Sequence, residues 1–152
     1  MTGGRLKRIK SFLNKDEIFC LTYGDGLTNV NINKLIKKHN NKKCLATVLA
    51  VKPPARFGSI KIVKDKVTKF SEKIVGNKEW INGGFFILSS KTINLIKNDK
   101  TIWERKPLET LAKNGELYAH KHNNFWFAMD TLKDKKMINQ LWHKKNAPWK
   151  VW

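Results

Sequence analysis

An aspartate between two glycines, Asp25 in the stretch IFCLTYGDG, is the first residue of this sequence that could do chemistry. Gly24 and Gly26 would let another group approach the chain closely. The preceding apolar run predicts a buried strand over 17–23, so Asp25 follows the carboxyl end of a strand, where α/β sheets bind ligands. Position alone leaves open a metal ligand, an Asx-type turn or a cap for the helix near Asn31.

A second carboxylate, Asp130, ends the aromatic stretch FWFAMD. Thr131 and Asp134 predict a capping box for the following helix, so we expect Asp130 to point elsewhere. Two carboxylates that each follow an apolar segment could share a divalent cation. Mg²⁺ prefers one or two carboxylates together with phosphate oxygens and water. The sequence leaves open whether Asp25 and Asp130 meet in space.

Two polar pairs could bind a sugar phosphate. Lys73 could donate to a phosphate and Glu72 could accept from sugar hydroxyls, although a solvated charge pair is the simpler interpretation of an isolated pair. Asn82 and Gly83, before an apolar run, could present an amide and bare backbone to a substrate, and a tight turn explains them nearly as well. Two further stretches that combine a base with glycines are interpreted as loops: 2–5 (TGGR) and 56–58 (RFG).

Other signals carry less chemistry. His120 and His122 could share a strand face, but no third ligand stands at a recognisable spacing, so an exposed strand is favoured over a metal site. The six tryptophans lie mostly in apolar stretches and are interpreted as core or interface residues. Cys20 and Cys44 fit buried thiols in a reducing compartment, which makes the cytoplasm the expected location.

The net charge of +19 invites a nucleic-acid interpretation. Lysine occurs 27 times and arginine only 4 times, and the lysines are scattered along the chain. Arginine is the residue that dedicated nucleic-acid faces use for bidentate contacts, so we do not expect nucleic acid as a partner. The sequence has no apolar run of about 18 residues, so we expect no membrane span.

Alternating elements must position these residues. The first third predicts helix, strand, helix and strand, which favours a parallel sheet covered by helices. Pro53 and Pro54 end that pattern, and a hairpin follows. The expected helices are 3–13, 31–40, one capped by Ser89 or Ser90, 106–114 and one after Thr131; the expected strands are 17–23, 44–51, 59–63, 67–72, 84–88 and 117–122.

Taken together, these motifs resemble the sugar nucleotidyltransferases, and among them the glucose-1-phosphate cytidylyltransferases. The stretches that carry the resemblance follow the family's order over nearly the whole chain: TGGRLKR, TYGDG, PPARFG, EK followed by WINGGFFIL, WERKPLETLAKNGEL, FWFAMDTL and NAPWKVW. The resemblance implies an α/β fold with a Rossmann-like nucleotidyltransferase sheet, flanking helices and a β-hairpin insertion. It also implies that CTP and glucose 1-phosphate react to give CDP-glucose and pyrophosphate, for deoxysugar synthesis in bacterial surface polysaccharides.

The resemblance assigns roles residue by residue. Asp25 and Asp130 match the two aspartates that bind Mg²⁺, the implied cofactor. Lys73 matches the lysine that holds the sugar phosphate, Glu72 matches the glutamate that contacts the sugar hydroxyls, and Arg5 matches a substrate contact. Lys73 and Arg5 are the residues expected to act in catalysis. The other expected substrate contacts are Gly24, Gly58, Asn82, Gly83 and Arg105.

The sequence departs from the family pattern in two places. Ile74 stands where the family commonly has proline after EK. The family's glycine-rich loop and Lys-Pro motif, which cradle the CTP phosphates, have no counterpart, so the resemblance implies one N-terminally truncated domain over 1–152 that matches the C-terminal portion of the family. We therefore expect exposed edges on strands 17–23 and 44–51, and little turnover by this chain alone. The alternative function is a non-catalytic sugar-phosphate-binding fragment, or a subunit that needs its missing half in trans; a homo-oligomer is the other expected assembly.

Overall fold

A four-stranded sheet forms the centre of the computed structural model, which describes residues 1–13, 17–53, 59–63, 66–71 and 80–152. Its strand order is β1 (Ile18–Thr22), β6 (Ile81–Ser89), β3 (Ala46–Val51) and β7 (Leu117–His122). β6 runs antiparallel to both of its neighbours, and β3 pairs with β7 in parallel. Two small antiparallel pairs complete the strands: β2 (Gly26–Thr28) with β8 (Trp126–Ala128), and β4 (Ser59–Val63) with β5 (Lys66–Ser71).

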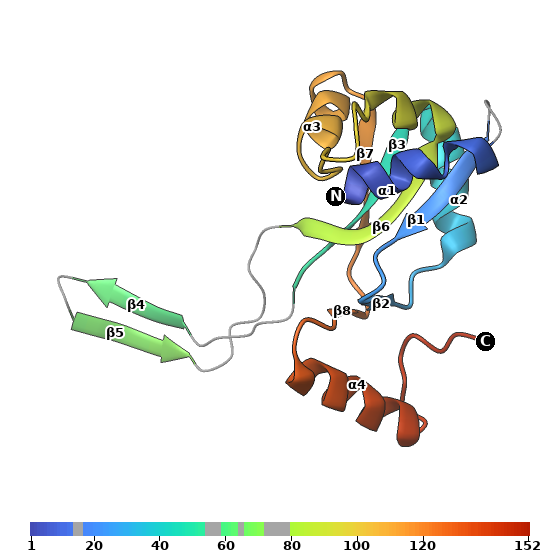
Figure 1. Ribbon diagram of the computed structural model, residues 1–152. Coiled ribbons are helices and arrows are strands. Elements are labelled where there is room, and N and C mark those ends of the chain that lie inside the picture. Colours follow the sequence, from blue (N-terminus) through green and yellow to red (C-terminus); the bar gives the residue numbers. More distant parts are fainter. Residues whose placement is uncertain (14–16, 54–58, 64–65, 72–79) are drawn as a thin grey trace.

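Helices cover both faces of this sheet (Figure 1). One core cluster joins alternate strand residues such as Phe86 and Leu88 to α1 (Thr2–Arg8), the 3₁₀ helix η2 (Ser90–Leu95) and α3 (Lys106–Lys113). On the opposite face, Thr47 of β3 contacts His39 of α2 (Ile32–Lys42), their Oγ1 and Nδ1 atoms being 2.9 Å apart. The chain ends in α4 (Leu132–His143) and a tail, and the short 3₁₀ helix η1 (Lys10–Phe12) follows α1.

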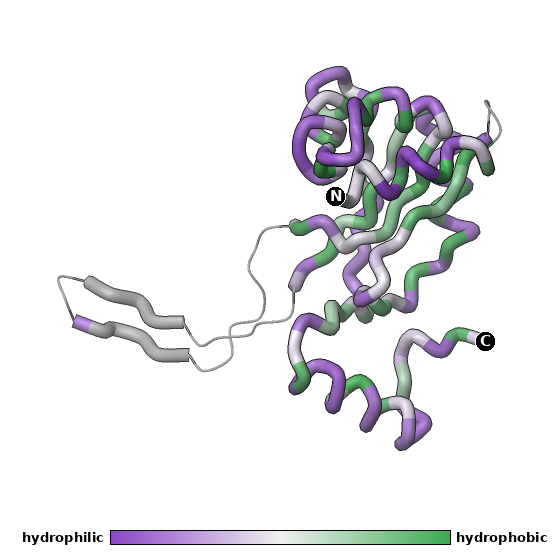
Figure 2. The backbone as a smooth tube through the Cα atoms, in the orientation of Figure 1, coloured by the Kyte–Doolittle hydropathy of each residue, from purple (hydrophilic) through white to green (hydrophobic). Residues whose placement is uncertain are grey.

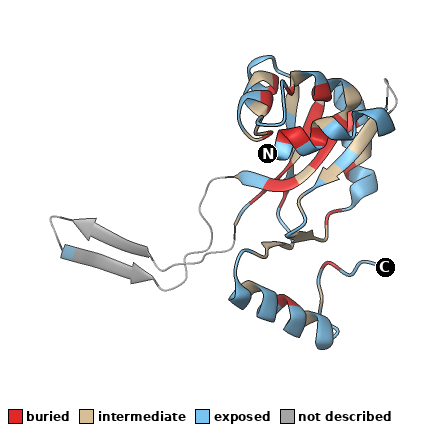
Figure 3. Ribbon diagram, viewed as in Figure 1, coloured by how far each residue is buried: buried red, intermediate tan, exposed pale blue. Residues whose placement is uncertain are grey.

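Buried residues concentrate in the central strands of the sheet, β3 and β6 (Figure 3). β3 is almost entirely buried because it has a strand on each side and helices over both faces. Figure 2 shows apolar residues along the central strands and polar residues on the outer faces of the helices. Within the described residues, no helix is long and apolar enough to cross a membrane.

The α/β class is confirmed, and several predicted elements are confirmed in type. The β4–β5 hairpin forms, Ser89 caps η2, and Thr131 with Asp134 forms the capping box of α4. The helix predicted over 3–13 is shorter in the structure. α1 ends at Arg8, and the separate 3₁₀ helix η1 follows it.

Two predictions about the sheet are wrong. β1 is neither parallel nor fully buried: it lies at the edge of the sheet, and Cys20 is exposed there, whereas Cys44 is buried as expected. β3 has no exposed edge, because β6 and β7 flank it. Strand neighbours come from residues far along the chain, which an apolar run does not specify.

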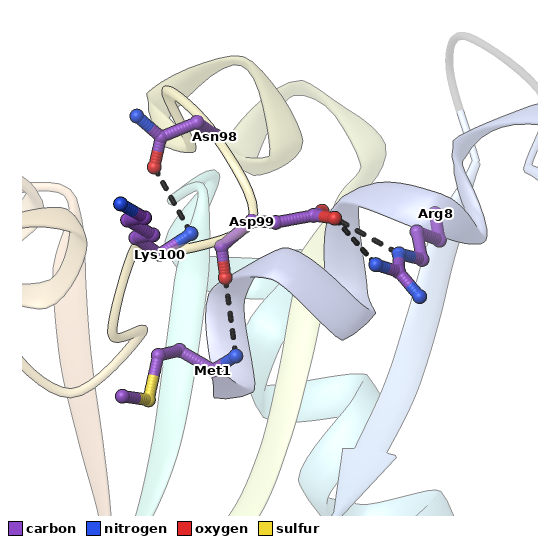
Figure 4. A network of polar contacts seen from close by, with 5 residues as sticks. All are labelled: Met1, Arg8, Asn98, Asp99 and Lys100. Atoms are coloured by element: carbon purple, nitrogen blue, oxygen red, sulfur yellow. Dashed lines mark hydrogen bonds and ion pairs between the residues drawn. The ribbon is translucent and has the colours of Figure 1, made fainter.

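The glycines at the start of α1 allow a close approach to the loop after η2. A Cβ atom on Gly4 would lie 2.6 Å from the Cα atom of Asp99, and one on Gly3 would lie 2.8 Å from the carbonyl oxygen of Thr101. Arg8 forms a salt bridge with Asp99, and the amino group of Met1 donates to the Asp99 carbonyl oxygen at 3.1 Å (Figure 4). The interpretation of 2–5 as a loop is wrong, because this stretch is the first turn of α1.

We expect Gly4→Ala to destabilise the protein, since the added methyl group collides with backbone that cannot rotate away. The free energy of unfolding should fall by about 1–3 kcal/mol in urea titration. Gly24→Ala is the matched control, because a Cβ atom there meets nothing within 4 Å. Equal stability of the two variants would contradict the close-approach explanation.

Candidate active site

A cavity of about 550 Å³ lies between α1, the end of β1 and the segment before α3. It collects residues from three distant parts of the chain, among them one base, two acids and three hydroxyl groups. The residues that line it are Thr2, Arg5, Leu6, Ile9, Leu21, Thr22, Tyr23, Gly24, Asp25, Trp103 and Glu104. Arg5, Gly24 and Asp25, all predicted from the sequence to be site residues, therefore share one cavity.

Arg5 offers this cavity an uncommitted positive charge. It lies on α1, whose position is fixed by the Gly3 and Gly4 contacts and by burial of Leu6. Within the described part of the chain, the Arg5 side chain has no hydrogen bond or salt bridge, whereas Arg8 is paired with Asp99. A guanidinium in this setting suits a phosphate or another anion.

Tyr23, Glu104 and Thr2 form a hydrogen-bonded chain along the cavity wall. The Tyr23 hydroxyl donates to Glu104 Oε1, and the Thr2 hydroxyl donates to Glu104 Oε2 at 2.6 Å. Burial, reinforced by the bond to Glu104, raises the pKa of Tyr23 above its ordinary value. Burial alone would raise the pKa of Glu104 too, but the hydrogen bonds from Thr2 and Tyr23 outweigh it and hold that pKa below its ordinary value.

Asp25 and Asp130 belong to segments that the β2–β8 pair joins. Beyond the last paired residues, Gly26 and Ala128, the Met129 N–H donates to the Asp25 carbonyl oxygen at 2.9 Å. Both aspartates are exposed. Asp25 lines the cavity, while Asp130 is not among its lining residues, and the Asp130 N–H donates to Asp134 Oδ2 at 3.2 Å. The segments thus meet through their backbones, and the shared metal site stays a prediction.

Asn82 and Gly83 lie beside this cavity wall on β6. Asn82 Oδ1 accepts from the Gly84 N–H at 2.9 Å, and a hydrogen bond from Asn82 partly offsets the rise in the pKa of Tyr23. Gly83 is packed closely: a Cβ atom there would lie 2.9 Å from the Leu49 carbonyl oxygen. Its own carbonyl oxygen accepts from Trp126 Nε1 at 2.7 Å. Packing therefore accounts for Gly83, and Asn82 remains a candidate substrate contact.

Of the remaining predicted residues, the structure describes only Arg105. Arg105 is exposed at the start of α3 and lines a separate hollow with Lys97 and Lys100. Its assignment to the same site as Arg5 stays a prediction. Gly58, Glu72 and Lys73 fall outside the described residues, as do Arg56 and Ile74.

The sequence did not single out Tyr23 and Glu104. Tyr23 is the last residue of the predicted strand over 17–23, and in WERKPL the predicted substrate contact is Arg105, whereas its neighbour Glu104 lines the cavity. No spacing rule links two residues so far apart along the chain. The interpretation of β7 as an exposed strand is wrong for His122, which is buried and whose Nε2 lies 3.0 Å from Asn29 Oδ1 and 3.2 Å from Thr28 Oγ1.

Comparison with known proteins defines the class. A family model described as "Nucleotidyl transferase" matches residues 3–143. The chain therefore belongs to the nucleotidyl transferase family. The structure of HddC from Yersinia pseudotuberculosis superposes with a TM-score of 0.65 at 24% identity, covering 93% of this chain and 62% of that one. At this identity the likeness shows the shared fold.

Among the relatives, the glucose-1-phosphate cytidylyltransferase of Salmonella typhi is 49% identical over 152 residues. The match takes in 100% of this chain and 59% of that enzyme, so the chain spans under two thirds of its relative's length. The mannose-1-phosphate guanyltransferase of Debaryomyces hansenii is 32% identical over 143 residues, which cover 88% of this chain and 39% of that one.

We expect Glu104 to stabilise the protein at neutral pH and to lose this effect in acid. Its folded-state pKa lies below the ordinary value of 4.5, so the unfolded chain takes up the proton first as the pH falls. The stabilisation should be complete above about pH 5 and should decline as the pH falls through the folded-state pKa.

Urea unfolding of the parent chain and Glu104→Gln over this pH range measures the effect. The difference in free energy of unfolding should shrink toward acid. Glu109→Gln, an exposed carboxylate on α3, is the matched control and should change stability less. A difference that stays constant with pH would rule out the hydrogen-bonded carboxylate as its source.

Proposed function

We propose that this chain carries part of the active site for cytidylyl transfer from CTP to glucose 1-phosphate. The observation that carries the proposal is 49% identity, over the whole chain, to a glucose-1-phosphate cytidylyltransferase. The likeness to a guanyltransferase is weaker, at 32%, which favours cytidine as the base. The cavity that brings together Arg5, Gly24 and Asp25 offers a place for the phosphates.

The reaction needs little acid–base chemistry. A phosphate oxygen of glucose 1-phosphate forms a bond to the α-phosphorus of CTP, and the bond from that phosphorus to the bridging oxygen breaks as pyrophosphate leaves. The nucleophile is already an anion, so no proton has to be removed. Positioning and charge neutralisation are then the main contributions of the protein.

Arg5 and Gly24 would each contact a substrate, and their surroundings support these roles. The Arg5 guanidinium would hold a phosphate oxygen against α1. Gly24 is needed neither for packing nor for a left-handed backbone, since a Cβ atom there meets nothing within 4 Å. A bare backbone at the cavity wall lets a nucleotide approach the amide closely. Lys73 would hold the attacking phosphate, and Glu72, with Gly58 and Asn82, would bind the sugar.

The donors near this cavity fit Mg²⁺ better than a metal bound by protein alone. Among the described residues, no group of three or more His, Cys, Asp or Glu side chains could hold a metal ion. Mg²⁺ needs only one or two carboxylates when phosphates and water supply the rest. Asp25 and Asp130 would be those carboxylates, and the bound ion would neutralise charge on the nucleotide phosphates.

A second candidate is a non-catalytic sugar-phosphate-binding fragment, or a subunit that needs the rest of the site in trans. The chain spans 59% of the length of the Salmonella typhi relative. A partner supplying the rest would complete the site, and without it the chain would bind sugar phosphate and not turn it over.

An assay of pyrophosphate release separates these functions. With CTP, glucose 1-phosphate and Mg²⁺, we expect little or no turnover by the 152-residue chain alone. Calorimetric titration with glucose 1-phosphate should still show binding that Arg5→Ala weakens roughly tenfold, as expected for loss of a charge-assisted contact. Robust turnover would refute the expected incompetence of this chain, and absence of binding would refute its role as a sugar-phosphate subunit.

Metal binding tests the two aspartates separately. In the presence of CTP, we expect Asp25→Asn and Asp130→Asn each to weaken Mg²⁺ binding by at least about tenfold, a loss typical even of residues that only support a ligand. Asp99→Asn is the matched control, because Asp99 is an exposed aspartate that pairs with Arg8 outside the cavity. If all three variants bind like the parent chain, the paired-aspartate site is wrong.

A further inference from the structure

The ribbon formed by β2 and β8 sets the distance between the two proposed metal ligands. Three residues of β2 pair with three of β8, and Figure 1 shows the pair between the central sheet and α4. Asp25 and Asp130 stand just beyond the same end of this ribbon. A slip of one residue would move one acid by about 3.3 Å and turn its side chain to the opposite face. Because three pairs specify a register only weakly, a contact from outside the ribbon has to fix it.

His122 of β7 makes such a contact at the other end of the ribbon. Its Nε2 atom lies 3.2 Å from Thr28 Oγ1, 3.0 Å from Asn29 Oδ1 and 3.1 Å from the Phe125 carbonyl oxygen. The same carbonyl oxygen accepts from the Thr28 hydroxyl at 2.9 Å and from the Asn29 N–H at 3.3 Å. One imidazole nitrogen thus contacts both segments of the ribbon where they pair.

The proton of this imidazole belongs on Nε2. A backbone carbonyl oxygen can only accept, so the nitrogen 3.1 Å from the Phe125 oxygen has to donate. Without that proton, two acceptors would face each other around a side chain that is only 7% exposed, where water cannot relieve their repulsion.

The central sheet holds His122 in place. It stands opposite Val51 in the parallel pairing of β3 with β7, and Val51 is fully buried. A side chain on this strand cannot follow a slip of the ribbon, so a slip would break the contacts of Nε2. Thr28 is three residues from Asp25, about 10 Å along a strand, so His122 acts on the acid only through the ribbon.

We propose that His122 is a positioning residue whose Nε2–H group fixes the register of β2 and β8 and so holds Asp25 and Asp130 at the separation that a shared Mg²⁺ ion requires. The Trp126 indole, which donates to Gly83, anchors β8 alone, whereas His122 contacts both segments. The part of the inference that concerns Mg²⁺ rests on the proposed function, and the register is a property of the chain itself.

Amide hydrogen exchange in the 152-residue chain tests the register. The Met129 N–H, which donates to the Asp25 carbonyl oxygen at 2.9 Å, reports on the end of the ribbon that carries the acids. His122→Ala should speed exchange at Met129 about tenfold. The Ala46 N–H, which donates to the Glu116 carbonyl oxygen at the opposite end of the β3–β7 pair, is the internal control and should change little.

Two further measurements separate the Nε2–H group from the bulk of the side chain. NMR of the imidazole nitrogens should place a proton on Nε2 of His122. His122→Gln puts an amide N–H near the position of Nε2, so it should restore slow exchange at Met129. If His122→Ala fails to fold, Thr28→Val removes the hydroxyl that contacts both Nε2 and the Phe125 oxygen and should speed the Met129 amide in the same way.

Mg²⁺ titration in the presence of CTP tests the consequence for the site. His122→Ala should weaken Mg²⁺ binding about tenfold, and His122→Gln should restore most of the affinity. His143→Ala, at an exposed histidine of α4, is the matched control and should bind like the parent chain. The titrations are run well below the unfolding transition, so that loss of folded protein does not contribute.

The outcomes separate this proposal from the proposed function. Unchanged exchange at Met129 in His122→Ala, or a proton on Nδ1 alone, would overturn the register assignment. Faster exchange with unchanged Mg²⁺ binding, while Asp25→Asn still weakens that binding, would overturn the positioning role. If Asp25→Asn and Asp130→Asn both bind Mg²⁺ like the parent chain, the proposed function fails at its metal site, and exchange at Met129 still decides the register.

Discussion

The pairing of β2 with β8 is the contact on which the candidate site depends, because it joins the segment of Asp25 to that of Asp130. A two-stranded ribbon is barely stable by itself. Here two side-chain contacts hold the ribbon against the central sheet. The Trp126 indole donates to the Gly83 carbonyl oxygen, and the buried His122 contacts Thr28. The position of the exposed acids is therefore set by packing in the sheet beneath them.

Two arginines on α1, Arg5 and Arg8, differ in whether an acid neutralises them. Glu104 is satisfied by hydroxyl groups of Tyr23 and Thr2, so it does not neutralise Arg5. Nearby on α1, Arg8 is neutralised by Asp99 at the surface. Arg5 therefore keeps an unneutralised guanidinium at the cavity. This position distinguishes Arg5 from the lysines, which are spread along the chain.

Local signals in the sequence predicted local structure well. The capping box at Thr131, the cap at Ser89 and the β4–β5 hairpin each depend on residues close together along the chain. The α/β class followed from the alternation of elements. The order and direction of the strands did not follow, nor did the burial of His122 or the part played by Glu104. Each depends on partners that no local pattern links, such as Val51 with Ile81 in the sheet and Tyr23 with Glu104 at the cavity. Among the site residues, Arg5, Gly24 and Asp25 were placed together through family likeness rather than spacing.

The candidate site is built directly on the core, because Leu6 and Trp103 belong to the buried cluster and also line the cavity. β3, the most buried strand, has β6 and β7 as neighbours, and helices lie over both faces of the sheet. The cavity lies at the end of β1, which is one of the two edge strands of this sheet, the other being β7. Leu6 and Arg5 stand on the same helix, so the apolar packing that holds α1 against the sheet also places the Arg5 guanidinium beside Gly24 and Asp25. A change that loosens this packing would therefore disturb the cavity as well as the stability of the fold.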